Sequence, residues 1–301
     1  MFIIMLNEVF GLLAGFLGFF INENIFSFQN IVLLAIGLFW LVFASVQDFK
    51  HREVENWWTF SLIIFVLAFR AFFSIETDDW GFFLWGVIGS IAGFIVAEAF
   101  YYSMMFAGGD AKMLMALGAI LFLGNDIKIN LFILALYLLL FVVCGSIYGM
   151  VYSFILTFKY LKDFKKSYKV LFKEYKKRII IIDFLVLLLL LFFVYYNFQI
   201  GVFLCVLLFV CPFMLIYAKS LEDSCMKVYV KVSELTIGDW LAKPLKIKGK
   251  KMEPYWEGLG EEELEFIQKN YSGKVLVKQG IPFITAFLFA LISLIMLFRL
   301  L

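Results

Sequence analysis

Two acidic residues lie where a largely apolar chain rarely places a charge. Asp48 follows the apolar run "WLVFASVQ" (40–47), and Asp110 follows two glycines in "FAGGDAKML" (106–114). A charged side chain at membrane depth is costly, so such residues are functional candidates by default. The first question is therefore what chemistry these two carboxylates could perform together.

Two carboxylates at the same depth on different helices can be neighbours in a helix bundle. Like charges at close range cannot both ionise, so one of the two retains a proton. The protonated carboxyl can act as a general acid, while the ionised one activates a water molecule as a general base. This is the chemistry of an aspartic protease, for which we expect neither a metal ion nor a cofactor.

The residues around Asp110 fit this chemistry but also have simpler interpretations. Gly108 and Gly109 lack a Cβ, so an extended substrate backbone could dock beside them. A helix that begins at Asp110 would favour its ionised form through the helix dipole, which predicts that Asp110 ionises more readily than Asp48. Equally, an Asp at a helix start is most often an N-cap, and an Asp after a span is often only interfacial.

The other polar residues inside apolar runs are few. Glu98 is a candidate accessory acid, although a structural hydrogen bond would explain it as well. Arg70 and Asp183 are expected to extend toward an interface. The four cysteines form no C-x-x-C pair, so the sequence supports neither a zinc site nor a disulfide framework, and we expect no metal.

The elements that must position these residues are membrane helices. The 301 residues are 64% hydrophobic, with a mean hydropathy of +0.95, and apolar runs of about 20 residues recur. The runs are continuous instead of alternating, which indicates helices. We predict an all-α polytopic membrane protein with about nine transmembrane helices, at 2–21, 31–47, 57–75, 80–105, 111–124, 130–158, 179–196, 201–217 and 280–299.

The charges in the loops predict the orientation of these spans. Basic residues cluster in residues 48–56, 159–178 and 218–278, and these three loops fall on one side when the spans are counted off. Positively charged loops stay in the cytoplasm. We therefore expect a multi-pass protein with a cytoplasmic N-terminus, an outside C-terminus, and both aspartates at the cytoplasmic face.

The chain is expected to divide into three parts. Residues 1–217 form a transmembrane helical domain whose catalytic core is about 30–125, and residues 280–301 form the last transmembrane helix. Between them, 218–279 reads as a small cytoplasmic α+β module, with short strand-like runs and a helix rich in glutamate. The basic segment 159–178 is amphipathic and suits an anionic leaflet, or else acts only as an orientation signal.

Two motifs together resemble a known family. "GGDAK" (108–112) resembles the G-x-G-D-x-K signature of the GxGD intramembrane aspartic proteases, in the type IV prepilin peptidase family. "DFKHREVENWW" (48–58) is similar to the segment that carries the second catalytic Asp of that family. The resemblance implies that Asp48 and Asp110 are the catalytic pair. It also implies a set of motif residues beside the docked substrate: Arg52, Asn56, Ala107, Gly108, Gly109 and Lys112.

Departures from the motif point to one branch of the family. Ala107 replaces the first Gly of the signature, Glu55 stands where bacterial members usually have Pro, and the bacterial tetracysteine motif is absent. The chain therefore resembles the archaeal preflagellin and prepilin peptidases, firmly over 30–125 and more loosely over 225–300.

This resemblance implies a defined reaction in the plasma membrane. The enzyme would remove class III signal peptides from archaellin or type IV pilin-like precursors, at the cytoplasmic face. Its expected partners are those precursors and the lipid bilayer, with no nucleic acid.

Two other functions remain open from the sequence. A proton- or cation-coupled transporter could use Asp48, Glu98 and Asp110 as a relay. Two observations argue against a transporter: the spans show no inverted repeat, and the acids lie at one boundary of the membrane instead of at its midplane. A scaffold for a filament or secretion machine would instead use the soluble module for contacts.

Overall fold

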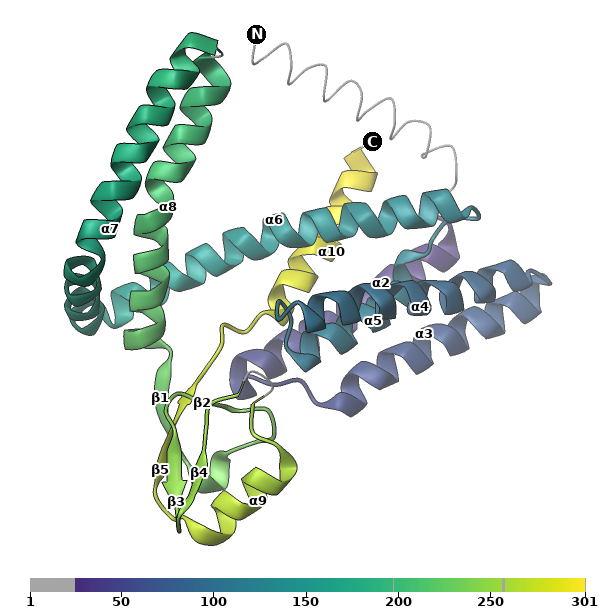
Figure 1. Ribbon diagram of the computed structural model, residues 1–301. Coiled ribbons are helices and arrows are strands. Elements are labelled where there is room, and N and C mark those ends of the chain that lie inside the picture. The colour runs from purple at the N-terminus through teal and green to yellow at the C-terminus, as the bar shows by residue number, and fades with distance from the viewer. Residues whose placement is uncertain (1–24, 197, 256–257, 301) are drawn as a thin grey trace. The chain divides into compact units, whose positions relative to one another are not determined.

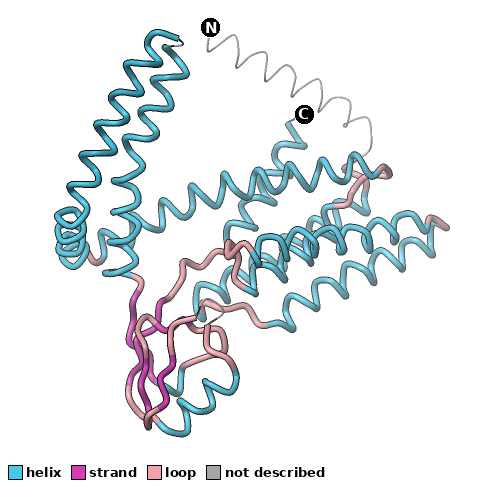
Figure 2. The backbone as a smooth tube through the Cα atoms, in the orientation of Figure 1, coloured by secondary structure: helices cyan, strands magenta, loops and turns pink. Residues whose placement is uncertain are grey.

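The computed structural model describes residues 25–196, 198–255 and 258–300, and this part of the chain is mostly helical (Figures 1 and 2). It divides into two compact units, with boundaries after Gly149 and after Gly280. The first unit runs to Gly149 and resumes at Ile281, whereas the second comprises Met150–Gly280.

The first unit is a helical bundle. Its elements are α2 (Phe28–His51), α3 (Asn56–Thr77), α4 (Trp80–Tyr102), α5 (Gly108–Leu121), most of α6 (Ile127–Lys159) and α10 (Ile284–Leu300). α5 packs against α4 and α3, and α10 packs against α2. Nine of the fourteen residues of α5 are buried, so this short helix lies in the core of the unit.

Local signals in the sequence explain where these helices begin and end. The side chain of Ser27 accepts the N–H of Asn30 and caps α2, and the side chain of Asp79 accepts the N–H of Gly81 at the start of α4. α3 ends at Asp78, whose backbone is left-handed (φ 55°). Asn and Asp are among the few non-glycine residues that tolerate this conformation.

Glycines bring α4 and α5 unusually close together. A Cβ at Gly89 would collide with the carbonyl oxygen of Gly118, and one at Gly93 would lie 2.8 Å from the carbonyl oxygen of Leu114. Small residues permit such close backbone approach in membrane bundles, where van der Waals packing drives helix association. The position of α5 is therefore set by direct contact between its backbone and that of α4.

The second unit combines long helices with a small sheet. It contains the end of α6, α7 (Leu161–Tyr196), α8 (Phe198–Cys225), β1 (Lys227–Lys231), the 3-10 helix η1 (Val232–Glu234), β2 (Trp240–Leu241), β3 (Leu245–Ile247), β4 (Lys250–Met252), α9 (Glu261–Asn270) and β5 (Lys274–Lys278). The strands form an antiparallel sheet in the order β1-β5-β2 and a separate β3-β4 pair. A core that includes Ile267 of α9, Val275 and Val277 of β5 and Met252 of β4 joins these elements. The strand-containing region near the C-terminus is thus confirmed.

Within residues 25–196, 198–255 and 258–300, five helices are long and apolar enough to cross a membrane: α2, α3, α4, α6 and the Gly201–Cys225 part of α8. They fit a multi-pass membrane protein. The predicted count of about nine spans is not confirmed. α5 has 14 residues, about 21 Å of helix, which is short of the roughly 30 Å hydrocarbon core. α10 is also shorter, and the predicted span 2–21 lies outside the described residues.

Candidate active site

Asp48 lies in the last turn of α2 and is almost completely buried, with 6% exposure. α2 ends at Arg52, whose left-handed backbone (φ 60°) lets its N–H donate to the carbonyl oxygen of Asp48 at 2.9 Å. The positive charge of Arg52 also acts on the Asp48 carboxylate. Arg52 therefore terminates the helix that presents Asp48.

The carboxylate of Asp48 binds the start of α10. The backbone N–H of Ile284, the first residue of α10, donates to Oδ2 of Asp48 at 3.0 Å in a buried position. The first N–H groups of a helix have no partner within it, and they carry the positive end of the helix dipole. This contact holds the Asp48 carboxylate against the first turn of α10. Sequence analysis missed it, because the two residues are 236 positions apart and a backbone N–H leaves no side-chain signal.

Two tyrosines of α6 hold α10 in this position. The hydroxyl of Tyr148 donates to the carbonyl oxygen of Pro282 at 2.8 Å, just before α10 begins. The hydroxyl of Tyr137 donates to the carbonyl oxygen of Phe287 at 3.1 Å, in the first turn of α10. The N–H that binds Asp48 is thus fixed by a third helix as well as by α2.

Asp110 lies in the first turn of α5, which begins at Gly108, two residues before the predicted start. Its Oδ2 accepts the N–H of Ala107 at 3.2 Å, and the backbone of Ala107 is extended where the helix begins. Asp110 therefore caps its own helix from the third helical position instead of from the N-cap itself. This capping role does not conflict with a chemical one, since the second carboxylate oxygen takes no part in that bond.

Asp110 and Asp48 are within electrostatic range of each other. Burial among the surrounding protein atoms and, next, the negative charge of Asp48 raise the pKa of Asp110 to about 7, against the lowering effect of the Ala107 N–H. The side chain itself retains some solvent exposure. These effects outweigh the dipole of α5, so the expectation that Asp110 ionises more readily than Asp48 is not supported. The protonation of Asp110 thus depends in part on the charge of Asp48.

The two sequence motifs are also joined directly. The Nζ of Lys112, in the first turn of α5, donates to Oδ1 of Asn56 at 2.6 Å, and Asn56 is the first residue of α3. Each of these residues lies in one of the two motifs, two and eight positions from its aspartate. This bond ties the segment after Asp48 to the helix that carries Asp110.

The chain beside Asp110 is open. A Cβ built on Gly108 or on Gly109 would meet no atom within 4 Å, and Ala107 is exposed. Neither glycine has the positive φ that would require its residue type. Packing within the described chain therefore gives no reason for glycine at these two positions, and the space next to them is free for another molecule.

Glu98 takes no part in this arrangement. It lies in α4, and among the hydrogen bonds and ion pairs of residues 25–196, 198–255 and 258–300 none involves it. The same part of the chain contains no group of three or more His, Cys, Asp or Glu side chains that could hold a metal ion.

Arg70 was expected to extend toward an interface, and this expectation is wrong. The side chain is fully buried in α3, where it donates to the carbonyl oxygen of Phe82 at 2.7 Å and to that of Phe122 at 2.6 Å. A Cβ on Gly86 would collide with it, so a glycine of α4 makes room for the guanidinium. Arg70 thus binds the chain immediately after α5, where unpaired carbonyl groups attract a cation.

Two asparagines complete the hold on this end of α5. Asn30 donates to the carbonyl oxygen of Leu123 at 2.8 Å, and Asn130 both donates to and accepts from the backbone of Gly124. Both side chains are buried. Non-helical backbone at membrane depth is tolerated only where protein satisfies its polar groups, and these residues do so. We name residues 122–124 the clamped segment.

Comparisons with known proteins agree with the motifs. Residues 35–158 match the type IV leader peptidase family. The predicted family resemblance is confirmed. The matched region extends past the predicted limit of 125 and includes nearly all of α6, whose Tyr137 and Tyr148 hold α10.

The curated relatives belong to the preflagellin peptidases. The chain is 39% identical over 88 residues to the preflagellin peptidase of Methanococcus maripaludis, and 37% identical over 95 residues to that of Methanocaldococcus jannaschii. These alignments cover 28% and 31% of this chain, and 36% and 38% of the relatives, so they span little more than a third of each relative. No solved structure gives a significant match.

Proposed function

We propose that this chain is a membrane aspartic peptidase that removes class III signal peptides from archaellin or type IV pilin-like precursors. The observation that carries the proposal is the unequal pair: Asp48 bound at the start of α10, and Asp110 with its pKa raised to about 7 partly by the charge of Asp48. The type IV leader peptidase match, and relatives named preflagellin peptidases, support this reaction.

In this proposal the two carboxyl groups have different roles. Asp48, whose Oδ2 binds the N–H of Ile284, takes a proton from a water molecule, whose oxygen attacks the scissile carbonyl carbon. Asp110 gives its proton to the carbonyl oxygen as the tetrahedral intermediate forms. When the C–N bond breaks, Asp48 passes its proton to the leaving amine, and Asp110 recovers one from the collapsing hydroxyl group. The cycle returns both groups to their starting states without a metal or cofactor.

The open backbone at Gly108 and Gly109 would receive the substrate. Because a Cβ at either position would meet only open space, an extended peptide can approach the first turn of α5 closely. Lys112, Asn56, Arg52 and Ala107 support this surface. Lys112 and Asn56 link the two motifs, Arg52 ends the helix of Asp48, and the Ala107 N–H holds Asp110.

We place this reaction at the cytoplasmic face of the cell membrane. The basic loop that follows Asp48 supports this orientation, since positively charged loops stay on that side. On the same basis residues 218–279 form a cytoplasmic module, between a transmembrane domain of residues 1–217 and a last span in 280–301. The role of Glu98 as an accessory acid has no support from its contacts, and neither does a relay of Asp48, Glu98 and Asp110 for transport.

Co-expression with a precursor tests this function. The full chain is expressed with an archaellin or type IV pilin-like precursor in a host that lacks such a peptidase, and leader removal is followed by mass spectrometry. We expect cleavage by the unaltered chain and none by Asp48→Ala or Asp110→Ala. Glu98→Ala is the matched control, an acid within the same unit, and it should cleave normally.

The outcomes separate the competing functions. Cleavage by both aspartate variants would rule out the aspartyl mechanism. If the unaltered chain leaves every such precursor intact but moves protons across vesicle membranes, and Glu98→Ala stops that movement, the transport function replaces the peptidase.

A further inference from the structure

The first half of α7 carries a dense row of cations on its outer side. Residues 161–178 contain seven lysines and one arginine against two acids, Asp163 and Glu174. All eight basic residues are exposed: Lys162, Lys165, Lys166, Lys169, Lys173, Lys176, Lys177 and Arg178. We call this surface the α7 cationic face.

The opposite, apolar side of the same helix is already occupied. Phe164 packs in a buried cluster with Leu221 and Cys225 of α8, and Leu171 and Ile179 form a second cluster with Ile216. The apolar side is therefore not free to enter a bilayer, as it would in a helix lying on the membrane by its amphipathic pattern alone. The side chains of α7 that remain available to contact another molecule are therefore those of the cationic face.

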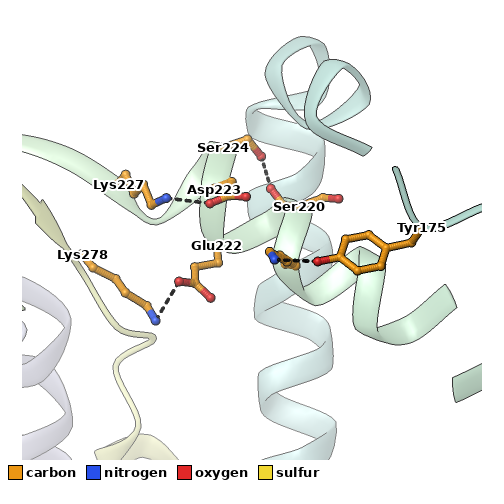
Figure 3. Close-up of polar contacts among 8 residues, drawn as sticks. Tyr175, Ser220, Glu222, Asp223, Ser224, Lys227 and Lys278 are labelled. Atoms are coloured by element: carbon orange, nitrogen blue, oxygen red, sulfur yellow. Dashed lines mark hydrogen bonds and ion pairs between the residues drawn. The ribbon is translucent and has the colours of Figure 1, made fainter. Parts of the chain in front are cut away.

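Two acids of α8 next to this part of α7 pair with lysines that lie outside the cationic face. Asp223, at the end of α8, pairs with Lys227 at 2.6 Å, and Glu222 pairs with Lys278 at 3.1 Å (Figure 3). In the described chain none of the seven α7 lysines forms an ion pair. With eight basic and two acidic residues in 161–178, this segment keeps a net charge of +6.

The cationic face adjoins an apolar surface suited to lipid. Directly after Arg178, α7 exposes Ile180, Ile181, Phe184 and Leu185, and it packs along α8, whose apolar part is long enough to span a membrane. In Figure 1 the first turns of α7 are seen nearly end-on while its later turns run beside α8, so this helix is not straight. In the sequence the last basic residue, Arg178, is followed directly by the apolar stretch.

We propose that the α7 cationic face binds the headgroups of anionic lipids. Charge complementarity selects this occupant, because a strongly net-positive surface lies where an apolar membrane surface ends and lipid phosphates begin. Binding is independent of the peptidase reaction, since α7 contributes no residue to the pair of aspartates. A signal that acts only to orient the helices during insertion would leave the purified protein with no such preference.

Lipid titration of the purified full chain tests this site. Short-chain phosphatidylglycerol, or phosphatidylcholine as the neutral probe, is added in detergent, and bound lipid is counted by native mass spectrometry. The test variant changes Lys162, Lys166, Lys169 and Lys173 to Gln. The matched control changes the same number of exposed lysines in the strand region, namely Lys243, Lys246, Lys248 and Lys274.

We expect phosphatidylglycerol affinity to fall at least about tenfold in the α7 variant and to stay unchanged in the control. Replacing the same four α7 residues with Arg should preserve binding, and salt should weaken it. Circular dichroism of all variants shows whether the helices are kept.

Three results would overturn the proposal. They are equal loss in the α7 and control variants, equal affinity of the unaltered chain for the neutral probe, or complete competition by soluble glycerol phosphate at the concentration of the lipid. The last result would assign the face to free phosphates instead of lipid. Peptidase activity is not measured, so this test stands whether or not the proposed function holds.

Discussion

The two ends of α5 differ sharply. At the first end, Gly108 and Gly109 lie beside open space, and the half-buried Asp110 side chain accepts a local hydrogen bond from the N–H of Ala107. At the other end, the clamped segment 122–124 is buried and bound by side chains from three different helices, α2, α3 and α6. One short helix thus joins an accessible end to a fixed one.

The difference indicates how a membrane protein can expose a reactive side chain and still hold that side chain in a fixed position. In the proposed function Asp110 must be reached by water and substrate, so other parts of the protein could not cover the first turn of α5. Precision must then come from the rest of the helix, through its close contact with α4 and through the clamped segment. We call the first turn of α5 its open end and the clamped segment its clamped end. Changes at the open end should therefore affect cleavage, while changes at the clamped end should affect stability.

The largest expected effect is at the open end. Asp110→Asn keeps the size of the side chain and an oxygen to accept the Ala107 N–H, but it removes the proton donor. We expect the cleavage rate of a purified precursor to fall by roughly 10²–10⁴-fold, the range for loss of a general acid. The midpoint of thermal unfolding should change little. A variant that loses stability in proportion to activity would show that this end is structural too.

At the clamped end, Arg70→Met should act mainly on folding. It removes the side-chain donor from the carbonyl oxygens of Phe82 and Phe122, and the Phe122 oxygen, beyond the end of α5, is left without a donor in a buried place. Such a loss costs about 1–3 kcal/mol, so we expect about 1–3 kcal/mol less stability to unfolding in a denaturing detergent. Lys112→Met, the loss of one exposed bond to Asn56, is the comparison and should cost under about 1 kcal/mol. Similar costs for both variants would contradict the contrast between the two ends.

The open end was the easier one to predict from sequence. Asp48 and Asp110 are conspicuous because a carboxylate at the edge of an apolar run needs a reason, and the motif residues around them supplied one. The clamped end gave no such signal. Asn30 and Asn130 resemble ordinary helix residues, and Arg70 could be recognised as a lone charge, but its acceptors are backbone carbonyl groups that any sequence provides.

The limits of the spans were hard to predict for a related reason. The apolar run continues from α5 into the clamped segment, so hydropathy alone predicts one helix over 111–124. The structure ends α5 at Leu121, because buried polar side chains offer the backbone other partners. Likewise the N–H of Ile284 that binds Asp48 depends on the packing of α10 against α2, which no local pattern encodes.

A pair of Gly→Ala variants compares the two ends with the same chemical change. Gly118→Ala places a methyl group against the backbone of Gly89, and we expect a loss of about 1–3 kcal/mol in stability. The methyl group of Gly109→Ala would meet no atom of the described chain within 4 Å, so stability should be unchanged or rise by up to about 1 kcal/mol.

Gly109→Ala should nevertheless impair the peptidase. If a substrate backbone docks there, kcat/KM should fall roughly tenfold, through poorer positioning of the scissile bond. Steady-state cleavage of a precursor peptide measures it. Unchanged kcat/KM would remove Gly109 from the docking surface without affecting the roles of the two aspartates.

The smallest expected effect is the response to pH, which also depends on the open end. Asp110 must be protonated to act as the acid, and its pKa is raised to about 7. The rate should therefore be steady just below pH 7 and fall about tenfold for each unit above it, because the protonated fraction falls by that factor. Part of this shift comes from the charge of Asp48, so Asp48→Asn should lower the pKa of Asp110, as carboxyl-carbon NMR or infrared titration would report. A pKa of Asp110 that stays at about 7 in Asp48→Asn would mean that burial alone raises it, and that the two carboxyl groups do not act as a pair.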